Sequence, residues 1–201
     1  MTISNECISI FKKAIKDYHV FDSVDQELKN PFSDIEVFKK NIYKKSWIDT
    51  VQWHLEDIIR KPSIDPKEAL QIKRRIDKSN QDRTDMVEII DEYFFNKFSN
   101  VKITEECNIN TETPAWAIDR LSILELKIFH MDVEANRSSA DEKHRLSCIS
   151  KLEILKAQRK NLSKAIDQLL DNISNGKTMA LTYKQMKMYN DDKLNPELYK
   201  D

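Results

Sequence analysis

Glycine is almost absent from this chain. Gly176 is the single glycine among 201 residues, whereas average usage would give roughly 14. A chain with one glycine cannot form the glycine-rich loops that hold phosphates or dinucleotides. It also lacks the residue on which the tight turns of multi-stranded sheets depend. The scarcity of glycine therefore favours helices and excludes the commonest nucleotide-binding motifs.

An excess of charge of either sign is also missing. The chain has 33 Lys and Arg against 34 Asp and Glu, a net charge of −1 with neutral histidines. We therefore expect no nucleic-acid binding, because neutralising phosphates requires surplus cations. No apolar run approaches the ~18 residues of a membrane span, and the N-terminus lacks the pattern of a signal peptide. The expectation is a cytoplasmic protein that contacts no membrane.

Cysteines are few and far apart. Cys7, Cys107 and Cys148 form no CxxC pair, so neither a zinc site nor a disulfide framework is expected. Hydrophobic residues make up 40% of the chain, which is enough for a genuine core. The length then predicts one domain spanning residues 1–201.

What the chain does contain is a series of helix signals. Two capping boxes, each a serine followed three residues later by a glutamate, predict helix starts. Two prolines that follow a capping Asp or Thr predict two more, and Gly176 stands where a left-handed residue ends the last helix. We predict an all-α bundle of about five long helices. Their expected spans are 5–21, Ser33 to Pro62 with a break near Ser46, 66–98, 114–131 and 140–174.

Two of these helices have distinctive patterns. Helix 114–131 is apolar on most sides, which predicts a central position. Helix 140–174 carries a heptad seam with Arg159 as its one polar member. The tail, residues 177–201, holds methionines, leucines and tyrosines, and we expect it to pack back on the bundle. The members of the seam are Cys148, Leu152, Leu155, Arg159, Leu162, Ile166, Leu169 and Ile173.

A polar stretch interrupts the long third helix. Residues 77–85 read DKSNQDRTD, while apolar residues at helical spacing flank them on both sides. The helix must therefore protrude, break or face a buried polar cluster. Arg83 lies on the line that faces the core, where an unpaired charge is strongly unfavourable. We predict that it joins Glu56, Asp77 and Arg120 in a partly buried cluster; the alternative is a solvated face or a structural ion-pair network.

Such a cluster suits a small anionic ligand, a sugar phosphate or a nucleotide, because guanidinium groups bind phosphate well. Candidate catalytic side chains would bind magnesium or act as a general base. The aromatic and histidine candidates are equally compatible with core packing. The candidate ligand-binding residues are Trp53, Arg60, Arg75, Asp77, Asn80, Gln81, Arg83, Asp119 and Arg120. The candidate catalytic residues are His54, Glu56, Asp57 and Glu88.

Known enzyme patterns are mostly missing. The chain has no GxSxG elbow, no HExxH motif and no ExxH pair, which excludes the usual serine-hydrolase, zinc-protease and di-iron sites. Glu88 and Asp91 form an ExxD pair, half of the magnesium pattern of helical nucleotide pyrophosphohydrolases. The preceding ExxE is absent, so a divalent metal is only weakly indicated and no metal ligands are predicted. A metal-dependent phosphohydrolase is kept as a second alternative.

Four segments carry a family resemblance: WHLEDIIRKPSIDP, KRRIDKSNQDRTDMVEIID, NTETPAWAIDRLSILELKIFHM and YKQMKMYNDDKLNP. Together they resemble the bacterial domain-of-unknown-function family 4254, from about Tyr18 to Tyr199. The resemblance implies a helical bacterial protein without an assigned activity, so it transfers no catalytic residue. Ala115 stands where the family has glycine, a tolerable change at a helix start.

A second function class is an interaction protein without catalysis. Helix 140–174 or the tail would then dock a protein partner, such as an enzyme of glycan assembly, or a second copy of the chain. The polar stretch 77–85 favours ligand binding over this alternative, because an adaptor has no need of it. Whether the protein is an enzyme is left open.

Overall fold

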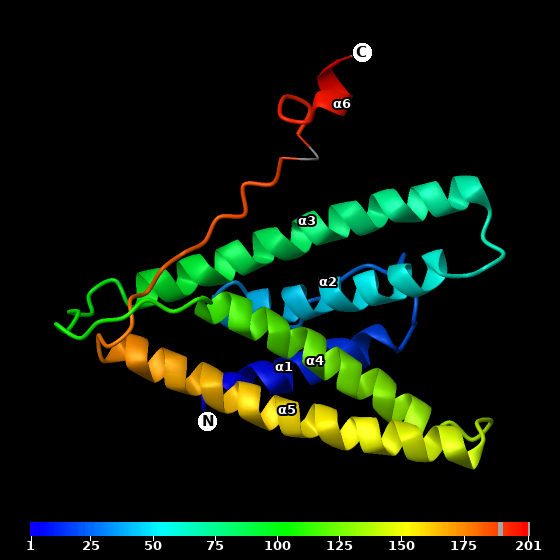
Figure 1. Cartoon of the computed structure of the whole chain (residues 1–201), viewed down its shortest axis with the longest axis horizontal. Coiled ribbons are helices and arrows are strands. Elements are labelled where there is room, and N and C mark those ends of the chain that lie inside the picture. Colours follow the sequence, from blue (N-terminus) through cyan, green and yellow to red (C-terminus); the bar gives the residue numbers. More distant parts are fainter. Residues whose placement is uncertain (189–190, 201) are drawn as a thin grey trace.

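Long helices form the whole frame of the molecule (Figure 1). The computed structural model describes residues 1–188 and 191–200. Within this part of the chain the only β-type pairing is an isolated bridge between Asn108 and Thr178, so the predicted all-α class is confirmed. The helices are α1 (Ile3–Tyr18), α2 (Val37–Ile59), α3 (Pro66–Lys97), α4 (Pro114–Ala135), α5 (Glu142–Ser174) and the short α6 (Pro196–Tyr199).

The proline-marked helix starts lie where the sequence predicts them. The Asp65 side chain accepts hydrogen bonds from the backbone N–H groups of Lys67 and Glu68, and Thr113 caps α4 in the same way. After the C-terminal end of α5, Gly176 has φ +70°, which is the left-handed cap expected there. A side chain there would collide with the carbonyl oxygen of Lys102.

Both serine capping boxes and the break at Ser46 are wrong. Helix α2 begins only after Glu36, and Ser33 lies in the turn before it. Helix α5 is capped by Asp141, whose carboxylate accepts from the N–H of His144 at 2.7 Å. The sequence prediction places this cap at Ser139, but Asp141 directly precedes the first helical residue, Glu142, and is an equally good capping residue. Ser46 is buried in the middle of an unbroken α2.

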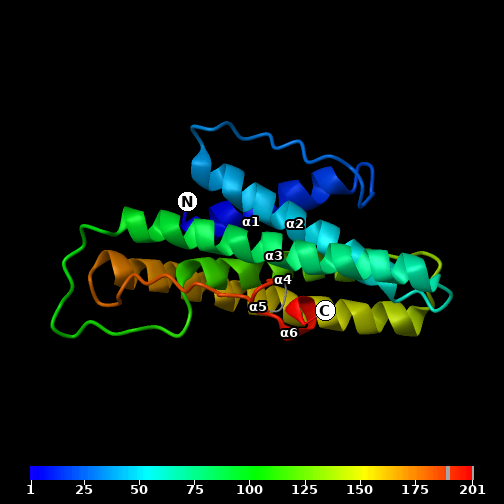
Figure 2. The same ribbon diagram turned by 90° about the horizontal axis from the view of Figure 1, so that it is seen from above.

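Helix α4 is the centre of the bundle, as its apolar composition predicts. It packs against α1, α2, α3 and α5. In Figure 2, α1 and α2 lie on one side of the layer formed by α3, α4 and α5. The main core lies between these groups of helices. Its largest fully buried members include Phe11, Tyr18, Tyr43, Phe94, Ile118 and Leu121.

The heptad seam of α5 faces α4 within the same chain. Cys148, Leu152, Ile166 and Ile173 are buried, and the other apolar members are partly buried. Arg159, the polar member, reaches the buried Glu125 of α4 at 3.4 Å. The expectation that Leu155, Leu162, Ile166 and Leu169 are buried against another helix is confirmed for Ile166, while the three leucines are only partly buried. Contact with a second copy through α5 would use a different face of the helix.

The C-terminal tail packs back only over its first part. Residues 177–187 run past the loop after α3 and then along α3, where the Lys187 ammonium donates to Thr84 Oγ1 at 2.6 Å and the backbone N–H of Gln185 to Glu88. The described residues beyond are mostly exposed (Figure 1). Apolar tail side chains such as Met186, Leu198 and Tyr199 are exposed, so the predicted packing is wrong for most of the described tail, which is held to α3 mainly by polar contacts. Tyr189, Asn190 and Asp201 lie outside the described residues.

Membrane insertion finds no support in the helices. Among the described residues no helix combines the length and apolarity that crossing a bilayer requires.

Candidate functional site

The polar stretch 77–85 lies inside a continuous α3. Its residues are mostly partly buried, so the helix neither breaks nor protrudes there. On one side the stretch meets the tail, and on another it faces α2 and α4 through Ser79, Asn80 and Arg83. Of the three possibilities for this stretch (that it protrudes, breaks or faces a polar cluster), the structure shows the last.

Arg83 belongs to a buried group of charges at mid-height of the bundle. Its Nε and Nη2 donate to the two carboxylate oxygens of Asp119 at 2.9 and 2.6 Å. The ammonium of Lys45 contacts Asp119 at 2.7 Å and also pairs with Asp49. Ser122 donates to Asp49 at 2.5 Å. We call Lys45, Asp49, Arg83, Asp119 and Ser122 the mid-bundle network; it combines two cations with two carboxylates.

The two carboxylates of the mid-bundle network differ in proton affinity. Burial raises the pKa of Asp49, the negative charge of Asp119 adds to the rise, and Lys45 only partly offsets it. Burial also acts on Asp119, but Lys45 and Arg83 together outweigh it and hold its pKa below the usual value. Asp49 Oδ1 is buried and has no hydrogen-bond partner among the described residues. Asp119 is therefore the firm anchor of Arg83, and Asp49 is the incompletely satisfied member.

Two hollows meet at Arg83. The first, which we call the carboxylate hollow, has a volume of about 310 Å³ and lies between α2, α3 and α4. The second, the basic groove, has a volume of about 720 Å³ and lies between α3, α4 and α5. Arg83 and Ile123 line both. The other residues of the carboxylate hollow are Asp49, Gln52, Trp53, Glu56, Asp57 and Arg60.

The hollows differ in charge. The carboxylate hollow has three carboxylates and two guanidinium groups, and Arg60 is paired with Glu56. The basic groove contains Arg83, Arg120 and Lys127 but only one carboxylate, Asp119, together with the amides of Gln158 and Asn161. An anionic group would therefore be attracted to the basic groove and repelled by the carboxylate hollow.

The predicted four-residue cluster is wrong. Asp77 pairs with Lys73 on the surface of α3, and Arg120 pairs with the exposed Glu112 at 2.9 Å. Arg83 follows Asp77 by six positions in α3, and at about 100° per residue this places the two side chains about 120° apart around the helix. Arg83 takes its acidic partners from α2 and α4 instead of from α3.

Other candidate residues are spread along α3. Arg75 donates to Asp25 at 2.8 Å and so holds the connector before α2. Asn80 accepts from Gln52 at 2.8 Å, and Gln81 donates to Asp85. None of these three lines either hollow. The structure thus gathers Trp53, Glu56, Asp57, Arg60, Arg83, Asp119 and Arg120 around the two hollows.

The ExxD pair of α3 is already bound by the chain itself. Glu88 pairs with Lys184 at 3.1 Å and accepts from the backbone of Gln185. Asp91 accepts from Thr113 and from the N–H of Ala115 at the start of α4. Burial raises the pKa of Asp91 to about 6. Both carboxylates therefore hold the structure together rather than face an open metal position.

The three histidines outside α5 meet at one end of the bundle. His54 Nε2 and His19 Nε2 are 3.2 Å apart, and one ligand atom from each of His19, His54 and His130 lies within 4.8 Å of the others. Burial lowers the pKa of His54, and it lowers that of His130 to about 4. Of these three histidines, only His54 is a candidate residue of the sequence analysis. No spacing signals their meeting, because they come from three different elements.

Trp53 connects the histidines with the carboxylate hollow. Its ring stacks on His130 with centroids 4.7 Å apart and an interplanar angle of 3°, and the same side chain lines the hollow. The interpretation of Trp53 as part of the packing and its interpretation as a ligand contact are both compatible with this position.

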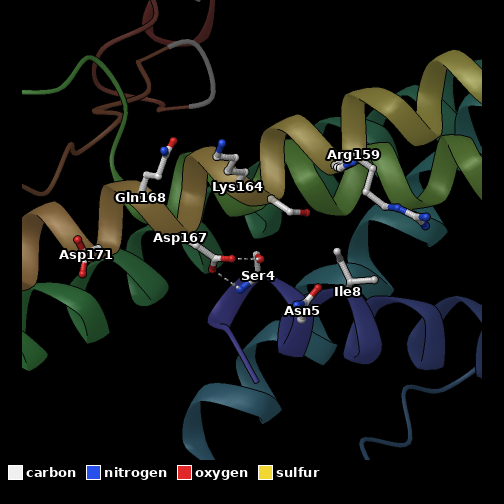
Figure 3. Close-up of a pocket in the computed structure, with 10 residues that line it drawn as sticks. Ser4, Asn5, Ile8, Arg159, Lys164, Asp167, Gln168 and Asp171 are labelled. Atoms are coloured by element: carbon white, nitrogen blue, oxygen red, sulfur yellow. Dashed lines mark hydrogen bonds between the residues drawn. The ribbon is translucent and has the colours of Figure 1, made fainter.

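A further groove of about 550 Å³ lies between α1 and α5 (Figure 3). There Ser4 donates to Asp167 through its backbone N–H at 3.1 Å and its hydroxyl at 2.6 Å. These bonds tie the first turn of α1 to α5. Along α5 the cations Arg159, Lys160 and Lys164 line one part of the groove and the carboxylates of Asp167 and Asp171 line the next. No sequence prediction placed a site in it.

Comparison with known proteins gives one match. A family described as a protein of unknown function (DUF4254) matches residues 39–181, which is more than half of the chain. The chain belongs to the DUF4254 family. The DUF4254 match includes the mid-bundle network and both hollows, whereas α1 lies before it. No curated protein and no solved structure matches the chain, so membership of DUF4254 establishes a relationship without an activity.

Proposed function

We propose that the protein binds a small ligand with one anionic group and several hydroxyls, of which a sugar phosphate is the simplest example. The observation that carries the proposal is the position of Arg83 at the junction of two hollows of different charge. The anion would occupy the basic groove, and the hydroxyls would occupy the carboxylate hollow.

The basic groove suits a phosphate group. Arg83 is held from behind by Asp119, yet its side chain is still 29% exposed. A guanidinium that is already fixed loses little conformational freedom when it binds a ligand. Arg120 and Lys127 add two further cations to the same groove. Together these groups supply the charge-assisted hydrogen bonds that phosphate recognition requires.

The carboxylate hollow suits hydroxyl groups. A hydroxyl both donates and accepts, and this hollow offers carboxylates, the amide of Gln52 and guanidinium groups. Asp49 Oδ1, which has no hydrogen-bond partner among the described residues and lies 3.7 Å from Arg83 Nε, would accept from one such hydroxyl. Nucleoside di- and triphosphates fit less well, because their additional charges would lie near Asp49, Glu56 and Asp57.

Calorimetric titration and thermal shift with a panel of probes test the proposal. The panel consists of hexose phosphates, the free hexoses, inorganic phosphate and nucleoside diphosphates. We expect hexose phosphates to bind most tightly and Arg120→Gln to weaken them at least tenfold. Arg75→Gln is the matched control. Like Arg120, Arg75 forms an ion pair with a carboxylate near the surface, that of Asp25, but it lines neither hollow. Indifference to the whole panel, or equal losses in both variants, would overturn the proposal.

Protein docking is the second candidate function. Leu146, Ile149 and Ile154 are exposed on α5, outside the seam that α4 covers, and they favour a protein partner such as a glycan-assembly enzyme or a second copy of the chain. Light scattering across a concentration series tests self-association through α5. A metal-dependent phosphohydrolase, a bacterial origin and a cytoplasmic location stay predictions from the sequence.

A further inference from the structure

We propose that His19, His54 and His130 bind a divalent transition-metal ion of the zinc class, with Asp22 as the fourth ligand. His19 caps the end of α1, His54 lies in α2 and His130 in α4. Asp22 lies in the turn that follows α1. The proposal is independent of the sugar-phosphate proposal, and it departs from the sequence analysis, which predicted no metal ligands.

The separation of the nitrogen atoms fits a shared ion. Two imidazole nitrogens bound tetrahedrally to zinc lie about 3.3 Å apart, since each Zn–N bond is about 2.0–2.1 Å long. The Nε2 atoms of His19 and His54 are 3.2 Å apart. The ligand atoms of all three histidines lie within 4.8 Å of one another. A side-chain movement on the order of 1.5 Å is then enough to complete the set.

His19 is held in the form that a metal needs. Its Nδ1 lies 2.7 Å from the carbonyl oxygen of Ile15, and only a protonated Nδ1 can donate to that oxygen. In neutral His19 the lone pair is consequently on Nε2, the atom that faces His54. A backbone carbonyl bound to the outer nitrogen is the usual support of a metal-binding histidine, because it fixes the ring and the tautomer.

His130 supplies a second, independent observation. Its Nε2 is buried and has no hydrogen-bond partner among the described residues. An orphaned buried polar atom is unfavourable and rare. In the contact between His19 and His54, one nitrogen donates a proton to the other. Neither of these two nitrogens forms a hydrogen bond with His130 Nε2. A cation resolves this, because it accepts the lone pairs of all three rings at once.

Aromatic neighbours hold the three rings in place. Tyr18 stacks on His54 with centroids 5.1 Å apart, and Trp53 stacks on His130 at 4.7 Å. Phe129 packs against His19 at 4.4 Å. Such packing limits ring rotation and so lowers the entropy lost when a metal binds.

Asp22 brings an oxygen to the open side of the histidines. Its Oδ1 lies 3.6 Å from His54 Nε2 and 4.0 Å from His19 Nε2. The residue has φ +50°, a left-handed conformation that aspartate tolerates better than most residues. Its side chain is 58% exposed, which gives an ion a route from solvent. Three imidazoles with one carboxylate select zinc, cobalt, nickel or copper over magnesium and calcium, which prefer all-oxygen sites.

Metal titration of chelator-treated full-length protein tests the proposal. We expect one equivalent of Zn²⁺ per chain, a higher melting temperature, and with Co²⁺ the strong visible absorption of a four-coordinate ion. Mg²⁺ should give neither effect. His54→Gln and His130→Gln should weaken zinc binding at least tenfold, and Asp22→Asn should weaken it less.

The fourth histidine provides the control. His144 pairs with Glu134 at 2.9 Å and lies outside the cluster, so His144→Gln should keep the full stoichiometry. Because a variant could fail to fold, the ring ¹⁵N signals of the wild-type histidines give a second measurement. Zinc should shift the signals of His19, His54 and His130 together. A shift confined to His144, no binding at all, or undiminished binding in folded His54→Gln and His130→Gln variants would overturn the proposal.

Discussion

The mid-bundle network and the histidine cluster both place polar groups among the helices, but they balance them differently. In the network, Lys45 and Arg83 face Asp49 and Asp119. In the cluster, three bases face one another, and a single exposed carboxylate lies nearby. Opposite charges can satisfy each other within the protein, whereas like groups need a partner from outside.

This difference separates structural from ligand-binding polar groups. The interior of the network is built from three helices, α2, α3 and α4, which already supply both signs of charge. Only Arg83 extends from it into the two hollows as a partly exposed cation. The three histidines and Asp22 include no permanent cation, and His130 Nε2 has no hydrogen-bond partner among the described residues, which is the basis of the proposed external cation.

Removing the central cation of the network should have the largest effect. Lys45 is only 1% exposed and contacts both buried carboxylates. We expect Lys45→Met to lower the free energy of unfolding by about 3–5 kcal/mol, because it leaves buried negative charge without its partner. Urea unfolding followed by circular dichroism measures this. Lys73→Met, which breaks the surface pair with Asp77, should cost less than about 1 kcal/mol; equal losses would contradict the distinction.

Asp91 tests what happens to a buried carboxylate that has only neutral donors. Burial raises its pKa to about 6 from 3.8, so between these values the folded state binds more protons than the unfolded state. The free energy of unfolding should therefore fall as the pH rises from about 4 to about 6, by up to roughly 3 kcal/mol. Asp91→Asn should remove this part of the pH dependence in unfolding curves. An identical slope in both proteins would show that neutral donors stabilise the charge sufficiently.

Zinc should stabilise the cluster without involving the network. At a free zinc concentration one hundred times the dissociation constant, the wild type should gain about 2.7 kcal/mol. A chelator should reverse the gain, and His130→Gln, with its at least tenfold weaker binding, should lower it by about 1.3 kcal/mol or more. Lys45→Met should show the same increment as the wild type if it remains folded, because the two regions share no residue. A smaller increment in that variant would mean that the regions are coupled.

Arg120→Gln should have the smallest effect on stability. Its ion pair with Glu112 is largely exposed, so the free energy of unfolding should change by less than about 0.5 kcal/mol. The same variant should lose the hexose-phosphate binding proposed above. Urea unfolding and calorimetric titration of one preparation measure the free energy of unfolding and the affinity for hexose phosphate. A large loss of stability would show that Arg120 has a structural role.

The local features of the fold were readable from the residues. Asp65 and Thr113, each followed by proline, mark helix starts, and Gly176 marks a helix end, because capping depends on groups only a few residues apart. The seam of α5 was readable from its spacing. The serine capping boxes failed for different reasons: Asp141 caps α5, whereas α2 begins after Glu36 without any side-chain cap.

Local patterns along the chain were enough to predict that it is helical, that α4 is central, and that Arg83 needs an acidic partner. Tertiary structure alone decided that this partner is Asp119 with Asp49 rather than Asp77, that two hollows meet at Arg83, and that His19, His54 and His130 come together. The physical reason is range. Periodicity and capping act within one or two helical turns, whereas the meeting of side chains from different helices depends on how those helices cross, which no spacing along the chain encodes.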